Sequence, residues 1–177
     1  MLIDVTSFTS GPRQIENAVE PPKTQNNVAV AERINGYIEF HQLRFLRRVV
    51  GKVLAETIDE YCRVEHKPHG EEPVEQNENQ QVEYAEPDER MESLIKLLKE
   101  PFADYVFFYI LRDMNVLPTI TGLVQLKCAN SYVSPISKGV DAWNRMVDGL
   151  CQFIDEASVE GVTIESEMLT YINNFNL

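Results

Sequence analysis

The sequence predicts a mostly α-helical protein, a small helical bundle with a long N-terminal arm and a projecting β-hairpin or extended arm. Long segments place apolar residues at the 3.6-residue spacing of helices. Between Thr119 and Val133 the helical spacing of apolar residues is replaced by an alternation of apolar and polar residues, as in a strand. The length of 177 residues, with 44% hydrophobic and 25% charged residues, suits one globular domain. We expect this domain to span residues 28–177 and to follow an N-terminal arm of residues 1–27.

The N-terminal residues mix Ser, Thr, Pro, Asn and Gln, and the pairs Gly11-Pro12 and Pro21-Pro22 interrupt any regular structure. Met1 to Val5 could add one edge strand. The rest has too little apolar surface to fold alone. We therefore expect an arm that is either mobile or bound to a partner.

The first long helix is expected from Val28 to Val50, with a bend at Gly51 and a continuation to Arg63. Its apolar residues fill one half of the helical wheel. The other half carries a basic face, made of Arg44, Arg47, Arg48 and Lys52. This face is either solvated or a seam that meets acidic residues of a neighbouring subunit. His41 lies beside it and is expected to be structural or solvated.

The segment Glu71 to Glu89, inside a predicted acidic loop at residues 65–90, contains eight carboxylates and neither Lys nor Arg. Such a composition is typical of a loop or of disorder. A short ordered piece could surround Val82 and Tyr84. The segment is either a solubilising loop or an acidic strap that docks on a basic face such as Arg44, Arg47 and Arg48.

A helix is expected again from Asp88 to Lys99, and Pro101 is expected to start a new one at its first position. The helix from Phe102 to Met114 is apolar almost all round, so it must be buried on every side. It is therefore either the central helix of the bundle or a helix that another subunit covers.

The alternating stretch predicts a β-hairpin or extended arm at residues 117–134. Ser134 and Pro135 are a typical start for the last long helix. Within it, Trp143 and Asn144 either pack at the core boundary or, in the case of Asn144, hydrogen-bond the backbone of the preceding arm. The tail from residue 162 to 177 is expected to form a short helix or strand against the bundle.

The sequence carries none of the common catalytic or phosphate-binding motifs. Cys62, His66 and His69 are zinc-ligand types, but their spacing fits no strong pattern and we expect no metal site. With three widely spaced cysteines, reduced thiols are the simple interpretation. The net charge of −12 argues against a broad surface that grips nucleic-acid phosphates, although DNA could slide past it.

Two stretches resemble a known family. One is YIEFHQLRFLRRVVGKVLAETI, from Tyr37 to Ile58, and the other is PFADYVFFYILRDMN followed by TGLVQLKCANSYVSPISKGVDAWNRM. Together they resemble the head-to-tail connector (adaptor, or head-completion) proteins of tailed bacteriophages, in particular a branch from phages of Bacteroidales-type gut bacteria. The matching residues are Tyr105 to Arg112, Thr121-Gly122, Lys127, Ala129-Asn130-Ser131, Val133-Ser134-Pro135 and Ala142-Trp143-Asn144. The likeness covers about two thirds of the chain. The long N-terminal arm and the expanded acidic loop depart from it.

The resemblance implies a mostly helical virion protein without enzyme activity or cofactor. It would form a homo-oligomeric ring, commonly of twelve subunits, between the portal and the tail, around passing genomic DNA that it does not read by sequence. Its partners would be the portal protein and a downstream neck or tail protein. Interface residues are expected at Arg44, Arg47, Arg48, Lys52, Trp143 and Asn144. Residues of an arm that contacts a neighbour or the channel are expected at Thr121, Gln125, Lys127 and Asn130.

Two other functions compete with the connector. The chain could be another helical phage or bacterial adaptor, such as a tail-completion protein that binds a single partner. It could also be a metal-dependent hydrolase that uses Cys62, His66 and His69. The N-terminus lacks the pattern of a signal peptide, and the longest apolar run is too short to span a bilayer. We therefore expect host cytoplasm during assembly and then the virion, with no membrane partner.

Overall fold

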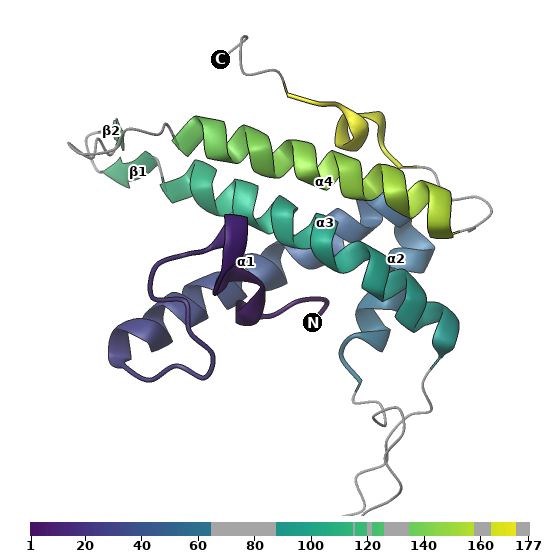
Figure 1. Cartoon of the computed structure of the whole chain (residues 1–177), viewed down its shortest axis with the longest axis horizontal. Helices are drawn as coiled ribbons and strands as arrows, with labels where there is room; N and C mark the ends of the chain where they lie inside the picture. The colour runs from purple at the N-terminus through teal and green to yellow at the C-terminus, as the bar shows by residue number, and fades with distance from the viewer. Residues whose placement is uncertain (65–87, 115, 120–121, 126–134, 158–163, 173–177) are drawn as a thin grey trace, which may run out of the picture.

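The computed structural model describes residues 1–64, 88–114, 116–119, 122–125, 135–157 and 164–172, and it is mostly helical (Figure 1). The four α-helices of this part are α1 (Gln25–Val50), α2 (Lys52–Tyr61), α3 (Glu89–Met114) and α4 (Pro135–Ala157). The shorter elements are the 3-10 helices η1 (Val5–Phe8), η2 (Gly11–Arg13) and η3 (Ser166–Leu169) and the strands β1 (Val116–Thr119) and β2 (Gly122–Gln125). The prediction of a mostly α-helical chain is confirmed.

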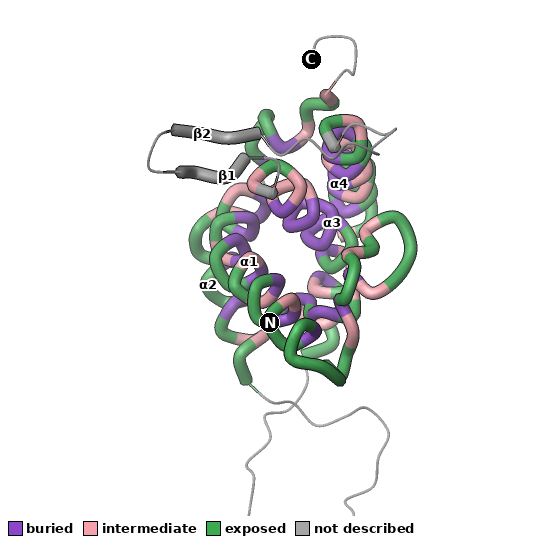
Figure 2. The backbone as a smooth tube through the Cα atoms, turned by 90° about the vertical axis from the view of Figure 1, so that its left-hand side faces the viewer, coloured by how far each residue is buried: buried purple, intermediate pink, exposed green. Residues whose placement is uncertain are grey.

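Helix α3 is the central helix, which is one of the two arrangements that its apolar sequence left open. It packs along α4 on one side and against α1 and α2 on the other (Figures 1 and 2). Every residue from Phe102 to Phe107 is buried. The helix is therefore covered within one chain, and no neighbouring subunit is needed to bury it.

The predicted break at Pro101 is wrong, because α3 runs through this residue without interruption. Proline inside a helix removes one backbone hydrogen bond and normally kinks or breaks the helix. Gly149 of α4 lies opposite Pro101, and a Cβ atom at this glycine would be 2.6 Å from Pro101 Cγ. Pro101 thus packs closely against α4, a tertiary contact that the sequence pattern does not reveal.

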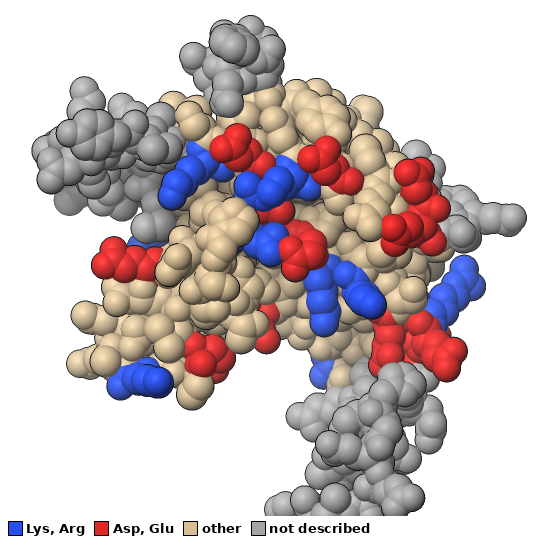
Figure 3. Space-filling model, in the orientation of Figure 1, with Lys and Arg blue, Asp and Glu red and all other residues tan. Residues whose placement is uncertain are grey.

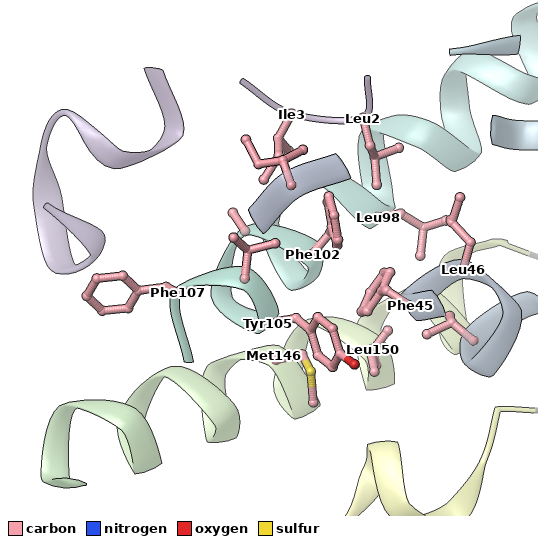
Figure 4. Close-up of a cluster of buried hydrophobic side chains, with 14 of the residues drawn as sticks. Leu2, Ile3, Phe45, Leu46, Leu98, Phe102, Tyr105, Phe107, Met146 and Leu150 are labelled. Carbon is pink, nitrogen blue, oxygen red and sulfur yellow. The ribbon is translucent and has the colours of Figure 1, made fainter. Parts of the chain in front are cut away.

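The N-terminal segment packs into the core of its own chain, whereas we expected an arm that is either mobile or bound to a partner. Residues Val5–Phe8 form a 3-10 helix instead of a strand, and Leu2 and Phe8 are almost completely buried. Figure 4 shows Leu2 and Ile3 above Leu98 and Phe102 of α3. The segment contributes to the same hydrophobic core as the four helices.

A buried polar relay fixes the start of this segment. The Leu2 backbone N–H donates to Gln42 Oε1 at 2.7 Å, and Gln42 Nε2 donates to Asp59 Oδ1 at 2.6 Å. Asp59 in turn pairs with Arg63 at 2.7 Å. Because buried polar groups need partners, these bonds set the position of the N-terminal backbone across α1 and α2.

Local signals explain both ends of α1. Thr24 and Asn27 form a reciprocal capping box that starts the helix three residues before the expected Val28. Gly51 has φ 77°, a left-handed conformation that favours glycine, and it separates α1 from α2. The predicted break at Gly51 is therefore confirmed.

Strands β1 and β2 pair antiparallel in the register Val116↔Gln125 to Thr119↔Gly122. They fall within the region where we expected a hairpin or arm. Residues 126–134 of that region, and residues 65–87 of the acidic loop, lie outside the described residues. The projecting arm itself stays a prediction.

The predicted contact of the tail with the bundle is confirmed by η3, in which Met168 is fully buried. Residues 164–172, which we call the strap, lie along α4 (Figure 1). Within the described ranges, no helix combines the length and the apolar composition needed to cross a bilayer.

Candidate interaction surfaces

Two motifs of the second resembling stretch meet in the fold. Tyr105 and Phe108 of α3 lie against Trp143 of α4, with ring centroids 6.4 and 5.0 Å apart. Trp143 is half-buried, so it closes the core boundary. The aromatic helix motif and the Ala142-Trp143-Asn144 motif thus form one packed unit.

Trp143 and Asn144 also hold the strap. Trp143 Nε1 donates to the Thr170 carbonyl at 2.8 Å. Asn144 donates from Nδ2 to the Ile172 carbonyl at 3.1 Å and accepts from the Ile172 N–H at 2.9 Å. In the described part of the chain this amide therefore fixes the segment after α4, whereas the sequence suggested the arm before it.

Half of the predicted basic face is already paired within the chain. Arg48 donates to Glu165 at 2.7 Å and to Glu167 at 2.9 Å, both in the strap region. Arg47 pairs with Glu56 of α2 at 2.9 Å. Each of these exposed ion pairs adds little stability. They nevertheless engage Arg47 and Arg48, which we expected to meet acidic residues of a neighbouring subunit.

Arg44 and Lys52 are exposed, and Arg44 stacks over the ring of Phe40 at 4.9 Å from its centroid. Phe40 is a large aromatic side chain, yet 62% of it is exposed. Scattered exposed apolar residues are normal on proteins. Phe40 differs from them because it borders a groove.

This groove, of about 300 Å³, is shallow and lies between α1 and the end of α3. We call it the Phe40 groove; its lining residues are Arg33, Gly36, Tyr37, Phe40, His41 and Asp113. A Cβ atom added at Gly36 would meet nothing within 4 Å, so the helix surface is open there. We did not predict this groove from the sequence. A signal was present, since Gly36 and Phe40 are four residues apart on a polar flank of the helix.

His41 lies under the groove and is buried. Its ring stacks on Tyr109 with centroids 4.3 Å apart and meets Phe40 edge-on at 5.0 Å. Its Nδ1 has no hydrogen-bond partner among the described residues. Burial, with smaller contributions from Arg44 and Arg112, lowers the pKa of His41 to about 4, so the ring is neutral at physiological pH.

A second polar cluster joins three elements at Asp104 of α3, which is buried. Arg145 of α4 donates to Asp104 Oδ1 from Nη2 at 2.7 Å and from Nε at 3.1 Å. Arg13 of η2 donates to Asp104 Oδ2 at 3.1 Å and also pairs with Glu100. Burial raises the pKa of the Asp104 carboxyl, although both arginines oppose the shift. The cluster locks the N-terminal segment onto α3 and α4.

The remaining predicted residues are not brought together by the described structure. Thr121, Lys127 and Asn130 lie outside the described residues. Gln125 is the last residue of β2 and pairs in register with Val116.

The metal-site candidates are also only partly described. Cys62 is half-buried, and its carbonyl accepts from the Met1 amine at 2.8 Å. His66 and His69 lie outside the described residues, so the predicted absence of a metal site is not tested. Among the residues with described positions, no group of three or more metal-ligating side chains occurs.

No protein-family model matches this chain, and the searches of curated proteins and of solved structures found no match either.

Proposed function

We propose that the chain is a structural subunit of a phage neck, which forms a ring between the portal and the tail and extends the DNA channel. The proposal comes from the resemblance of two stretches of the sequence to head-to-tail connector proteins. A mostly helical fold is the coarse feature that this family implies.

The observation that carries the proposal is the contact between two motifs of the second resembling stretch, one on α3 and one on α4. Tyr105 and Phe108 pack on Trp143, so residues far apart in the sequence belong to one structural unit. This contact supports a shared architecture and does not depend on any single motif.

The charge distribution is compatible with a channel protein. On the face in Figure 3, Lys and Arg side chains lie beside Asp and Glu side chains and form no broad basic patch. The net charge of −12 adds a general repulsion of nucleic acid. DNA could therefore move past such a ring without being held by its phosphates.

The structure changes which residues we propose for the interfaces. Trp143 and Asn144 hold the strap within the chain, and Arg47 and Arg48 form ion pairs within it. Arg44 and Lys52 remain exposed candidates. The predicted arm residues Thr121, Gln125, Lys127 and Asn130 keep their proposed role as contacts to a neighbour or to the channel.

The test is the mass of the protein in solution, alone and with the portal protein encoded by the same genome. Twelve chains of 20.3 kDa would give a ring of about 240 kDa. We expect this assembly either for the protein alone or on the portal. A one-to-one complex with another protein would favour the single-partner adaptor. A chain that stays monomeric and does not bind the portal would refute the connector.

A further inference from the structure

The Phe40 groove combines an aromatic surface with an uncovered flank of α1. Phe40 is 62% exposed, Tyr37 is half-buried, and the opening at Gly36 leaves room beside both rings. The neutral ring of His41 lies underneath and adds no positive charge. Within the described residues nothing else covers this surface, so an aromatic side chain could stack there.

The rim of the groove is cationic. Arg33 and Arg44 are exposed and form no ion pair with any described residue. Arg112 and Asp113 pair with each other at 3.2 Å, so their charges largely cancel. Two arginine charges therefore remain beside the rings, on a chain whose net charge is −12. A ligand that fits this site has negative charge and one aromatic group.

The chain itself contains such a ligand. Residues 71–89 have eight carboxylates, neither Lys nor Arg, and one aromatic residue, Tyr84, with Glu83 and Glu86 close to it. We propose that Tyr84 of one copy docks in the Phe40 groove of a second copy, with its neighbouring carboxylates against Arg33 and Arg44.

The contact cannot form within one chain. Tyr84 is four residues from Asp88, so an extended backbone reaches at most about 14 Å from that point. Asp113, at the groove, is 25 residues after Asp88 along α3, or about 37 Å at 1.5 Å per helical residue. Figure 1 shows α3 running from one end of the molecule to the other. Tyr84 therefore cannot reach the groove of its own chain, and the partner must be another copy.

A contact between two different surfaces of identical chains is heterologous. It repeats from copy to copy and closes into a ring when the rotation per subunit allows. The inference thus deepens the proposed function and rests on the self-assembly that it includes, although it does not depend on a phage origin. In this inference the acidic segment meets Arg33 and Arg44 instead of Arg47 and Arg48, which are already paired within the chain.

The inference is tested with a labelled peptide of residues 71–89 and a full-length receptor that carries Tyr84→Ala, so that its own segment does not compete. Fluorescence anisotropy measures binding at low and high salt. We expect saturable binding, at least tenfold weaker for receptor Phe40→Ala or for peptide Tyr84→Ala, and retained for peptide Tyr84→Phe. Arg33→Ala with Arg44→Ala should weaken binding and flatten its dependence on salt.

The matched controls are Val53→Ala and Lys96→Ala. Val53 of α2 is 80% exposed and Lys96 of α3 is exposed, and both lie outside the groove. Each should leave the affinity within about twofold, since the contact does not include them. Circular dichroism of every receptor checks that it is folded.

The outcomes separate this inference from the proposed function. Peptide binding that Phe40→Ala abolishes supports the inference, even if the portal is not bound. No peptide binding, equal binding to Phe40→Ala, or equal binding of a scrambled peptide overturns it, even if a ring forms by other contacts.

Discussion

The buried histidine under the groove makes stability depend on pH in a way that one substitution can isolate. In His41→Phe, an aromatic ring of similar size replaces the imidazole between Phe40 and Tyr109. The packing is nearly preserved, and only the ability to take up a proton is lost. The difference between the two proteins therefore reports the ionisation of His41.

The magnitude follows from the pKa. In the folded chain the pKa of His41 is lowered to about 4, against the ordinary 6.5 of an unfolded chain. Between these values the unfolded chain binds a proton that the folded chain does not, so stability falls as the pH falls. At 1.36 kcal/mol per pKa unit the full loss is about 3 kcal/mol. From pH 7 to pH 5 it is about 2 kcal/mol.

The assay is urea unfolding of both proteins at pH 7 and pH 5, followed by circular dichroism. Other titrating groups, including His66 and His69, occur in both proteins and cancel in the comparison. The wild type should lose about 2 kcal/mol relative to His41→Phe on going to pH 5. Parallel pH profiles of the two proteins would show that His41 is not buried as a neutral ring.

Three substitutions test the packing that positions the surfaces. Asp104→Ala leaves Arg145 without its carboxylate partner and Arg13 with Glu100 alone, and it should lower the free energy of unfolding by about 2–4 kcal/mol in urea titrations. An unchanged midpoint would contradict the cluster. Gly149→Ala forces a Cβ atom against Pro101 and should lower the free energy of unfolding by about 1–2 kcal/mol. Its control, Gly36→Ala, should instead stabilise the exposed helix by about 0.5–1 kcal/mol. Equal effects at both sites would refute the close approach of α3 and α4. Asn144→Ala removes two hydrogen bonds to the strap. Hydrogen exchange of residues 164–172 should therefore accelerate while α3 stays protected. A uniform acceleration in both segments would argue against a local role of Asn144.

The sequence predicted those elements whose cause is local. Apolar periodicity located α1 and the central α3, and Gly51 marked the break before α2 through its own backbone conformation. The continuity of α3 through Pro101 was not predictable in this way. Pro101 packs closely against Gly149, nearly fifty residues further on, and no local rule relates the two positions.

The N-terminal segment shows the same limit. Leu2 and Phe8 are scattered among polar residues, so their pattern resembles that of a loop. Their burial depends on α1 and α3 and on the hydrogen bond from Leu2 to Gln42, which a sequence pattern does not reveal. The basic face was predicted correctly as a helix surface. Its intramolecular pairing with Glu56 was not, because side-chain partners depend on the tertiary fold.

The central claim is that copies of this chain join head to tail through Tyr84 and the Phe40 groove, and one mixing measurement addresses it directly. Phe40→Asp removes the groove but keeps the acidic segment, and Tyr84→Ala does the reverse. Native mass spectrometry should find each variant monomeric alone, and their equimolar mixture should stop at dimers of about 41 kDa, since only one intact contact can form. Larger assemblies of either variant alone, or a mixture that contains only monomers, would contradict the account.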